Sequence, residues 1–270
     1  MRIFFTFLFF IQILSNAFSE SSFLSSERLL VKFDHSINEV KSFWKNKQSV
    51  NLNNNPIRIK LSTFYLSFQP EESAMSYSLE VGHVNSKRMQ VKSLGRSDSR
   101  LGVKWNLYDS DPYLDWNHHL EIGLIIKGSY NDQVMNAAGD GANGIDFSYS
   151  SYKIYHSLDA IFSHKLALVV KSNDVPVEAF YQTEISKRFF TLNTLLGLKG
   201  YSSFSGIDIG QVGYQFPRDL NKVNEKSLSY FLELNKSFGK HSVSISYLNT
   251  IKGQNTNKLS GIKLGIYYRF

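Results

Sequence analysis

From residue 57 onward, hydrophobic and polar residues alternate along most of the chain. In one segment, Leu101, Val103 and Trp105 alternate with Gly102 and Lys104. A period of two is the spacing at which the side chains of a β-strand point to opposite faces of a sheet. The alternation predicts about twelve strands, near residues 57–68, 75–82, 100–107, 120–126, 144–155, 161–171, 177–185, 190–200, 206–216, 228–234, 243–247 and 262–270.

The residues before this region follow a different spacing. Leu30, Phe33, Ile37, Val40 and Trp44 recur at intervals of three and four, which would place them on one face of a helix. Residues 20–55 are therefore predicted to form an N-terminal segment with a short amphipathic helix, and 51–56 a linker. A partly disordered extension is the alternative. Residues 56–270 would form the β-domain.

The first residues have the form of a secretory signal peptide. Arg2 supplies a positive charge, residues 3–14 are almost entirely apolar, and small residues follow at Ser15 and Ala17. About a dozen apolar residues are too few for a membrane-spanning helix, which needs about 20. Residues 1–19 are therefore predicted to be a cleaved signal, so that the protein is exported by the Sec pathway.

Composition narrows the functional classes. The chain has no cysteine, which excludes disulfides, thiolate metal sites and a lipidated cysteine. Its formal net charge is +7, but the basic residues are scattered among the strands and form no Lys/Arg block. Nucleic acid is therefore not an expected partner. The anionic groups of a membrane, or an anionic solute, remain possible partners.

The length of the predicted strands favours a membrane barrel. Most segments run for about ten residues, which matches a tilted strand that crosses a bilayer. Closure into a barrel would also remove the unpaired edges of so large a sheet. We therefore predict an all-β fold, a closed antiparallel up-and-down transmembrane β-barrel of about twelve strands, with its apolar face toward lipid and its polar face toward the lumen.

The C-terminus carries a resemblance to a known class. Residues 262–270 alternate apolar and polar positions and end on Tyr268, Arg269 and Phe270. This ending resembles the assembly signal of bacterial outer-membrane β-barrels. The resemblance implies insertion by the barrel-assembly machinery, with Tyr268 and Phe270 as the recognised residues, and it implies the outer membrane and its lipid as surroundings. Residues 139–146 are also loosely similar to barrels of the meta-pathway phenol-degradation transporter type.

Catalytic and metal-binding patterns are weak. None of the seven histidines is followed two positions later by serine, as in the outer-membrane phospholipase A and lipid A deacylase types. Acidic residues and histidines do gather in one connection, at Asp109, Asp111, Asp115, His118 and His119. A solvated loop explains this cluster better than an omptin-like protease site or a cation site. We therefore predict no enzyme activity and no cofactor.

The remaining candidate site is the polar face of the strands. Assigning faces strand by strand predicts lumen-facing charges at Arg58, Lys60, Glu80, Arg100, Lys104, Glu121, Lys127, Asp146, Glu178, Glu184, Lys199, Glu233, Lys263 and Arg269, and also at Lys165, Lys171 and Asp208. Such a mixed lining, with basic residues in slight excess, could conduct small solutes. The same charges could instead pair and close the bore, which would leave a pore-less structural or adhesion barrel.

Two further expectations follow from the strand assignment. Gly123, on the lumen face beside the lipid-facing Ile122, should accept a lysine at a much smaller cost than Ile122 does. Counting strands back from a periplasmic C-terminus also places the long connections 85–98 and 130–143 on the periplasmic side. Outer-membrane barrels keep that side short, so the count points to an error of one strand in the first half of the chain.

Overall fold

The structure is a computed structural model that describes residues 29–52, 55–71, 73–108, 115–130, 141–209, 211–215 and 222–270. The predicted signal peptide, the start of the N-terminal segment, and Asp109 and Asp111 lie outside the described residues. The described part contains no helix long and apolar enough to cross a membrane. Its one helical turn is η1, His156–Leu158.

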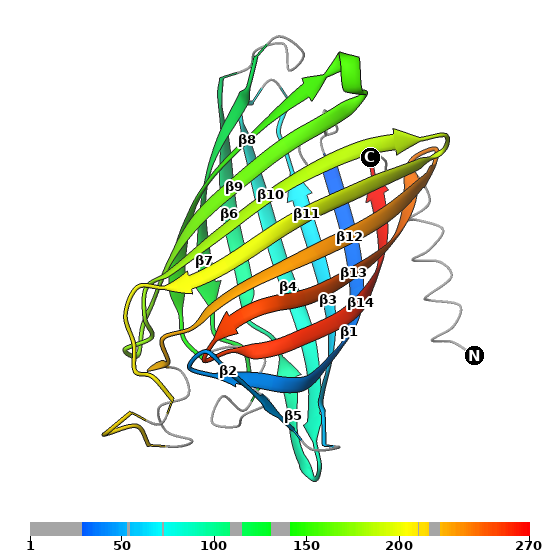
Figure 1. Ribbon diagram of the computed structural model, residues 1–270. Helices are drawn as coiled ribbons and strands as arrows, with labels where there is room; N and C mark the ends of the chain where they lie inside the picture. Colours follow the sequence, from blue (N-terminus) through cyan, green and yellow to red (C-terminus); the bar gives the residue numbers. More distant parts are fainter. Residues whose placement is uncertain are drawn as a thin grey trace, which may run out of the picture.

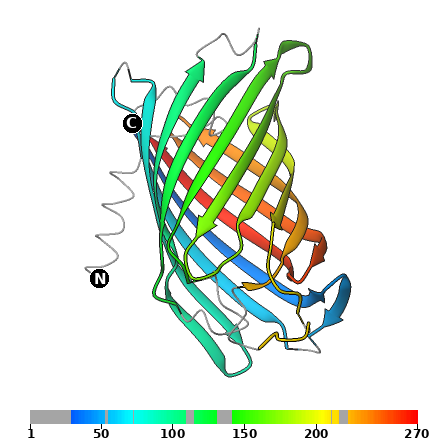
Figure 2. The same cartoon turned by 90° about the vertical axis from the view of Figure 1, so that its left-hand side faces the viewer.

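Twelve antiparallel strands close into a barrel (Figures 1 and 2), as the alternation predicted. Each strand pairs with its neighbours in chain order, and β1 pairs with β14 to complete the ring. The barrel strands are β1 (Leu29–Lys45), β3 (Ile57–Phe68), β4 (Met75–Arg88), β6 (Ser99–Tyr108), β7 (Asn117–Ile126), β8 (Gly144–Tyr155), β9 (Ala160–Lys171), β10 (Glu178–Phe189), β11 (Leu192–Ser203), β12 (Lys226–Phe238), β13 (His241–Gln254) and β14 (Asn257–Arg269).

Two additional strands extend one end of the barrel. β2 (Gln48–Asn51) folds back on the last residues of β1, and β5 (Val91–Arg96) folds back on the last residues of β4. Both hairpins lie at the end opposite the C-terminus (Figure 1). We call this end the far end, and the end that holds the C-terminus the near end.

The expected helix at residues 30–44 is wrong, because this segment is strand β1. Its register with β3 and β14 places Phe33 and Ile37 on the outside and Lys32 and Asp34 on the inside. The apolar residues recur at helical intervals, but residues 31–38 also alternate, and pairing on both sides stabilises the extended form. β1 closes the barrel, so the barrel begins at residue 29 and not at 56.

The expected strand near 206–216 is also not part of the barrel. These residues lie in the connection 204–225, where Ile207 makes an isolated bridge to Val223. Because this segment was counted as a strand, every strand before it was assigned the opposite direction. The error therefore lay in the second half of the chain, and the connections that contain 85–98 and 130–143 lie at the far end.

The two ends of the barrel differ in their connections. Near-end connections are short, with two-residue turns at 190–191 and 239–240 and none longer than 109–116. The longer connections, 46–56, 89–98, 127–143 and 204–225, all join strands at the far end. The barrel is therefore asymmetric, with one end of tight turns and one end of loops.

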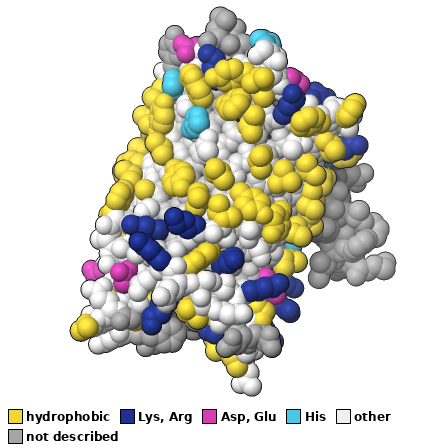
Figure 3. Space-filling view, in the orientation of Figure 1, with side chains coloured by type: hydrophobic (Ala, Val, Ile, Leu, Met, Phe, Trp, Pro, Cys, Tyr) yellow, Lys and Arg dark blue, Asp and Glu magenta, His cyan; other side chains and the backbone are white. Residues whose placement is uncertain are grey.

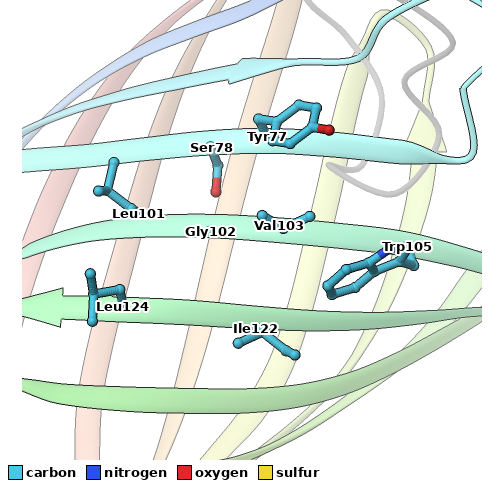
Figure 4. A pocket seen from close by; sticks show the side chains of 8 residues that line it. All are labelled: Tyr77, Ser78, Leu101, Gly102, Val103, Trp105, Ile122 and Leu124. Carbon is cyan, nitrogen blue, oxygen red and sulfur yellow. The ribbon is translucent and has the colours of Figure 1, made fainter.

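The outer face carries the large hydrophobic side chains. Leu101, Ile122 and Leu168, from three different strands, are each more than 40% exposed. Figure 3 shows hydrophobic side chains covering the middle and upper part of one face, with lysine and arginine side chains gathered below them. On β4, β6 and β7 these side chains line a shallow groove of about 390 Å³, shown in Figure 4. An apolar exterior is the reverse of a soluble barrel, whose apolar side chains face inward.

Candidate functional site

The inner wall of the barrel carries the charges predicted for it on most strands. Because side chains alternate between faces, the residues beside the exposed apolar positions face the interior. By this placement the inner face holds Glu80, Arg100, Lys104, Glu121, Asp146, Glu178, Glu184, Lys199, Glu233, Lys263 and Arg269, together with Lys165 and Lys171.

Four expected positions differ. Arg58 and Lys60 face outward, since they share the outer face of β3 with Phe64, and the Arg58 side chain is 72% exposed. The inward positions beside them, Ile57, Ile59 and Leu61, are apolar. Ile57 is fully buried and packs in one cluster with Val40 and Leu52 of the far end. Packing of these apolar residues inside the barrel forces their basic neighbours outside.

The other two differences arise at the strand ends. Lys127 follows the last residue of β7 and is exposed, so it belongs to the far-end connection and not to the inner wall. Asp208 lies in the connection 204–225, where its carboxylate accepts hydrogen bonds from Asn255 Nδ2 at 2.6 Å and Gln254 Nε2 at 3.3 Å. It therefore ties a loop to the β13–β14 turn.

The tightest group on the inner wall is centred on Arg100 of β6. Its Nε and Nη2 donate to the two carboxylate oxygens of Asp146 at 2.7 and 2.6 Å, and its Nη1 donates to Glu121 at 2.6 Å. Glu121 is also bound by Lys165 at 3.3 Å. We call Arg100, Glu121, Asp146 and Lys165 the Arg100 cluster. Its two-pronged arginine–carboxylate contact is among the strongest ion-pair geometries.

Two glycines make room for this cluster. Gly102 and Gly123 are paired directly across β6 and β7, both on the inner face. A side chain at Gly123 would meet the carboxylate of Asp146 and the guanidinium of Arg100, and one at Gly102 would meet Ser78 and Arg100. Arg100 therefore lies along the wall, over the glycines, to reach β7 and β8. A lysine at Gly123 would have to displace these side chains, and its smaller cost relative to a lysine at Ile122 stays a prediction.

A second group spans the β1–β14 seam. Lys263 of β14 lies 3.6 Å from Asp34 and 3.7 Å from Glu233, and Lys32 lies 3.0 Å from Asp34. The Tyr267 hydroxyl donates to Glu233 at 3.1 Å, and the Lys32 ammonium lies 4.7 Å from the centre of the Tyr267 ring. We call Lys32, Asp34, Glu233, Lys263 and Tyr267 the Lys263 cluster.

Lys32 and Asp34 are not among the predicted inner-wall charges, because the spacing of the apolar residues around them favours a helix. Their signal was present, since Val31, Phe33 and Ile37 alternate with Lys32, Asp34 and Ser36. Between the two clusters, Lys32, Tyr65, Glu80 and Arg100 are direct neighbours across β1, β3, β4 and β6. The charges therefore form a continuous belt over much of the inner wall.

The two inward acids of β10 are also held by neighbours. Glu184 accepts hydrogen bonds from Ser163 and Gln182, at 2.8 and 2.7 Å. Glu178 is bound by Lys171 at 2.8 Å and by the Tyr201 hydroxyl at 2.9 Å. Charges buried on a protein wall are stable only when they are paired in this way.

Solvent reaches part of the belt. The side chains of Lys165 and Lys263 are 42% and 33% exposed although both face the interior, and Lys199 and Phe180 on β11 and β10 are also exposed there. These side chains would be buried if packing closed the middle of the barrel. The wall thus combines fixed ion pairs with lysines that face open space.

Of the histidines and acids gathered near 109–119, the structure describes Asp115, His118 and His119, and the two histidines lie on opposite faces of β7. His118 faces outward and its Nδ1 lies 2.6 Å from the Tyr149 hydroxyl, whereas His119 faces inward and lies 2.7 Å from Asn106. Among the described residues, no group of three histidines or acids could hold a metal ion.

The residues of the expected assembly signal are in contact at the near end. The rings of Tyr268 and Phe270 are 4.1 Å apart, and the Phe270 amide donates to the Leu29 carbonyl at 3.0 Å. This bond extends the β1–β14 seam to the end of the barrel. Recognition of these residues by the assembly machinery stays a prediction.

Comparison with known proteins places the fold. The sequence matches no protein-family model, and no curated protein is significantly similar to it. The structure is similar to the COG4313 outer membrane channel from Pseudomonas putida F1, with a TM-score of 0.75 and 12% identity over 94% of this chain and 100% of that chain. The chain has the fold of outer-membrane β-barrels.

Two further solved structures also have a fold similar to this barrel. The NanC porin has a TM-score of 0.55 and 9% identity over 88% of this chain and 100% of that chain. The translocator domain of the autotransporter NalP from Neisseria meningitidis has a TM-score of 0.53 and 11% identity over 92% of this chain and 90% of that chain. At identities this low, the structural similarity establishes only a shared architecture. The inner wall must therefore be interpreted from the residues of this chain.

Proposed function

We propose that this protein is an outer-membrane channel that passes small solutes through a water-filled bore lined by mixed charges. The observation that carries the proposal is the exposure of Lys165 and Lys263 on the inner wall, in the middle of their strands. A channel or porin fold in the similar structures supports it. Belts of fixed charge in a bore select solutes by sign and by size.

The difference between the two ends of the barrel supports one orientation of the barrel in the membrane. Outer-membrane barrels have short turns on the periplasmic side and longer loops outside. The near end holds the start of β1, the end of β14 and the tight turns. We therefore propose that the near end is periplasmic and the far end extracellular. The exposed apolar band between them would lie in the hydrocarbon layer, and Sec export would deliver the chain to the periplasm.

Electrical recording in planar bilayers tests the channel. Purified folded protein should give small, steady conductance with a weak preference for anions, because basic residues only slightly outnumber acidic ones on the inner wall. The preference should weaken at 1 M salt, where the Debye length is about 3 Å. Folded protein that inserts but conducts at no salt concentration would favour the pore-less structural barrel instead.

Paired substitutions on β9 test the membrane assignment independently of conduction. Leu168 faces outward and is 47% exposed, whereas its neighbour Ala167 faces the interior. Leu168→Lys should destabilise the refolded barrel in lipid vesicles by roughly 2–4 kcal/mol, and Ala167→Lys by much less, because the lumen holds water. Equal losses in urea unfolding would contradict a lipid-facing exterior.

A further inference from the structure

The basic residues that face outward on the far end form one patch. Arg58 and Lys60 lie on the outer face of β3, and Lys87 of β4 lies directly opposite Arg58. Lys41 and Lys258 lie on the adjacent strands β1 and β14, and all five side chains are exposed. We call Lys41, Arg58, Lys60, Lys87 and Lys258 the basic rim.

Positive charge in this patch is poorly compensated within the described residues. Glu39 lies 3.2 Å from Lys41 and 3.7 Å from Arg58, and these two basic side chains are 75% and 72% exposed. Like charges directly opposite each other across two strands, such as Arg58 and Lys87, destabilise the pairing. The patch therefore favours an anion that bridges these strands.

The basic rim directly borders the apolar band. Lys60 is paired with Ile37 of β1, which is in turn paired with Ile262 of β14, and both isoleucines are about half exposed. Along β3, the outer face passes from Lys60 through Ser62 to Phe64. A ligand that carries negative charge at one end and acyl chains at the other fits this boundary.

We propose that the basic rim binds the phosphate groups of an anionic lipid in the outer leaflet, with its acyl chains on the apolar band beside β1, β3 and β14. The inference rests on the proposed membrane position and orientation of the barrel, and not on conduction. Free phosphate is a poorer fit, because the charges are spread over a convex surface on four strands and form no enclosed site. A lipid gains from both the charges and the adjacent apolar surface.

Native mass spectrometry of the full chain in detergent micelles tests this proposal. The probes are a diphosphorylated lipid A-type glycolipid and its dephosphorylated form. The test variant is Arg58→Gln, Lys60→Gln, Lys87→Gln. The matched control is Lys153→Gln, Lys187→Gln, Lys236→Gln, which removes the same charge from outward positions at the near end, where each lysine lies 5.4–5.7 Å from an aromatic ring centre.

The wild-type protein should bind the phosphorylated probe at least tenfold more tightly than the dephosphorylated one. The far-end variant should lose roughly tenfold or more, since each basic residue near an anionic surface contributes several-fold in affinity, and the near-end variant should bind like the wild type. Equal binding of both probes, or equal losses in both variants, would overturn the proposal. Competition by millimolar inorganic phosphate would also overturn it, in favour of free phosphate.

Folding of each variant is checked by the shift of the folded barrel on unheated electrophoresis. If the far-end variant does not fold, the single substitutions Lys60→Gln and Lys153→Gln replace the triple variants. A loss of affinity for the phosphorylated probe, smaller than for the triple variant, is then expected for Lys60→Gln and not for Lys153→Gln. Failure of the lipid test leaves the conductance and the β9 substitutions unaffected. The two proposals can therefore fail separately.

Discussion

The two charge clusters on the inner wall are built from similar residues but differ in how tightly they are held. In the Arg100 cluster, three hydrogen bonds of 2.6–2.7 Å join Arg100 to two carboxylates that are 15% exposed or less. In the Lys263 cluster, the two carboxylates lie 3.6 and 3.7 Å from the ammonium group, which is one-third exposed. Arg100 is locked to the wall, whereas Lys263 faces the bore.

The difference would allow one wall to serve both stability and the proposed conduction. Breaking a buried pair leaves a charge without a partner and is costly, whereas an exposed pair contributes little. We therefore expect Arg100 to hold β6, β7 and β8 in register, and Lys263 to act mainly on passing ions. A count of residue types would not reveal this division, because the two clusters contain similar residues and differ only in their geometry.

The largest effect is expected for removal of Arg100. Arg100→Ala leaves Glu121 and Asp146 facing each other without their shared partner, and should lower the free energy of unfolding by roughly 2–4 kcal/mol, less than for a fully dry pair because solvent reaches the guanidinium. Lys263→Ala should lower it by less than about 1 kcal/mol. Urea unfolding in vesicles, followed by tryptophan fluorescence, measures both. Similar losses would erase the contrast between the clusters.

A smaller effect is expected beneath Arg100. Gly123→Ala places a methyl group against Arg100 and Asp146, and should cost about 1–3 kcal/mol because the guanidinium must leave its position on the wall. The cost should shrink when Arg100→Ala is already present, so the two changes are coupled. Additive costs in the double-mutant cycle would show that the glycine does not serve the cluster.

The smallest effect on stability should accompany a change in selectivity. Lys263→Gln removes a charge that faces the bore, and should reduce the ratio of anion to cation permeability by roughly twofold at low salt, with little change in unfolding. Lys153→Gln removes a charge from the outer face and is the control. Reversal potentials under a salt gradient measure the ratio, and an equal shift in both variants would contradict the placement of Lys263.

Closure was predictable, because alternation records which face of each strand meets lipid. The number of strands was matched because two errors cancelled: β1 was missed, and a strand was expected near 206–216. The bounds of β3 and β8 coincide with the predicted segments 57–68 and 144–155. Two errors arose where local pattern and tertiary context disagree. Residues 30–44 suit a helix locally, and become strand β1 only because β3 and β14 provide edges on both sides.

Faces were harder to assign than strands at the rims. The rule that charges face the lumen holds for the predicted positions on β6 to β9. It fails for Arg58 and Lys60, where the outer face lies beyond the apolar band and the inner face packs Ile57. The ion-pair partners of the inner-wall charges could not be predicted from the sequence. Arg100 binds residues 21 and 46 positions away, and only the register of three strands brings them together.

The seam between β1 and β14 has a consequence for how the barrel forms. Leu30 is paired with Arg269, so the ring is closed by segments from opposite ends of the sequence. Contacts of such high sequence separation form slowly, because almost the whole chain must be ordered to make them. During synthesis β14 is delivered last, and until then the edge of β1 stays open to pairing with other chains. Closure of the ring is therefore a late event in folding, and the edge of β1 must be kept from pairing with other chains until β14 reaches it.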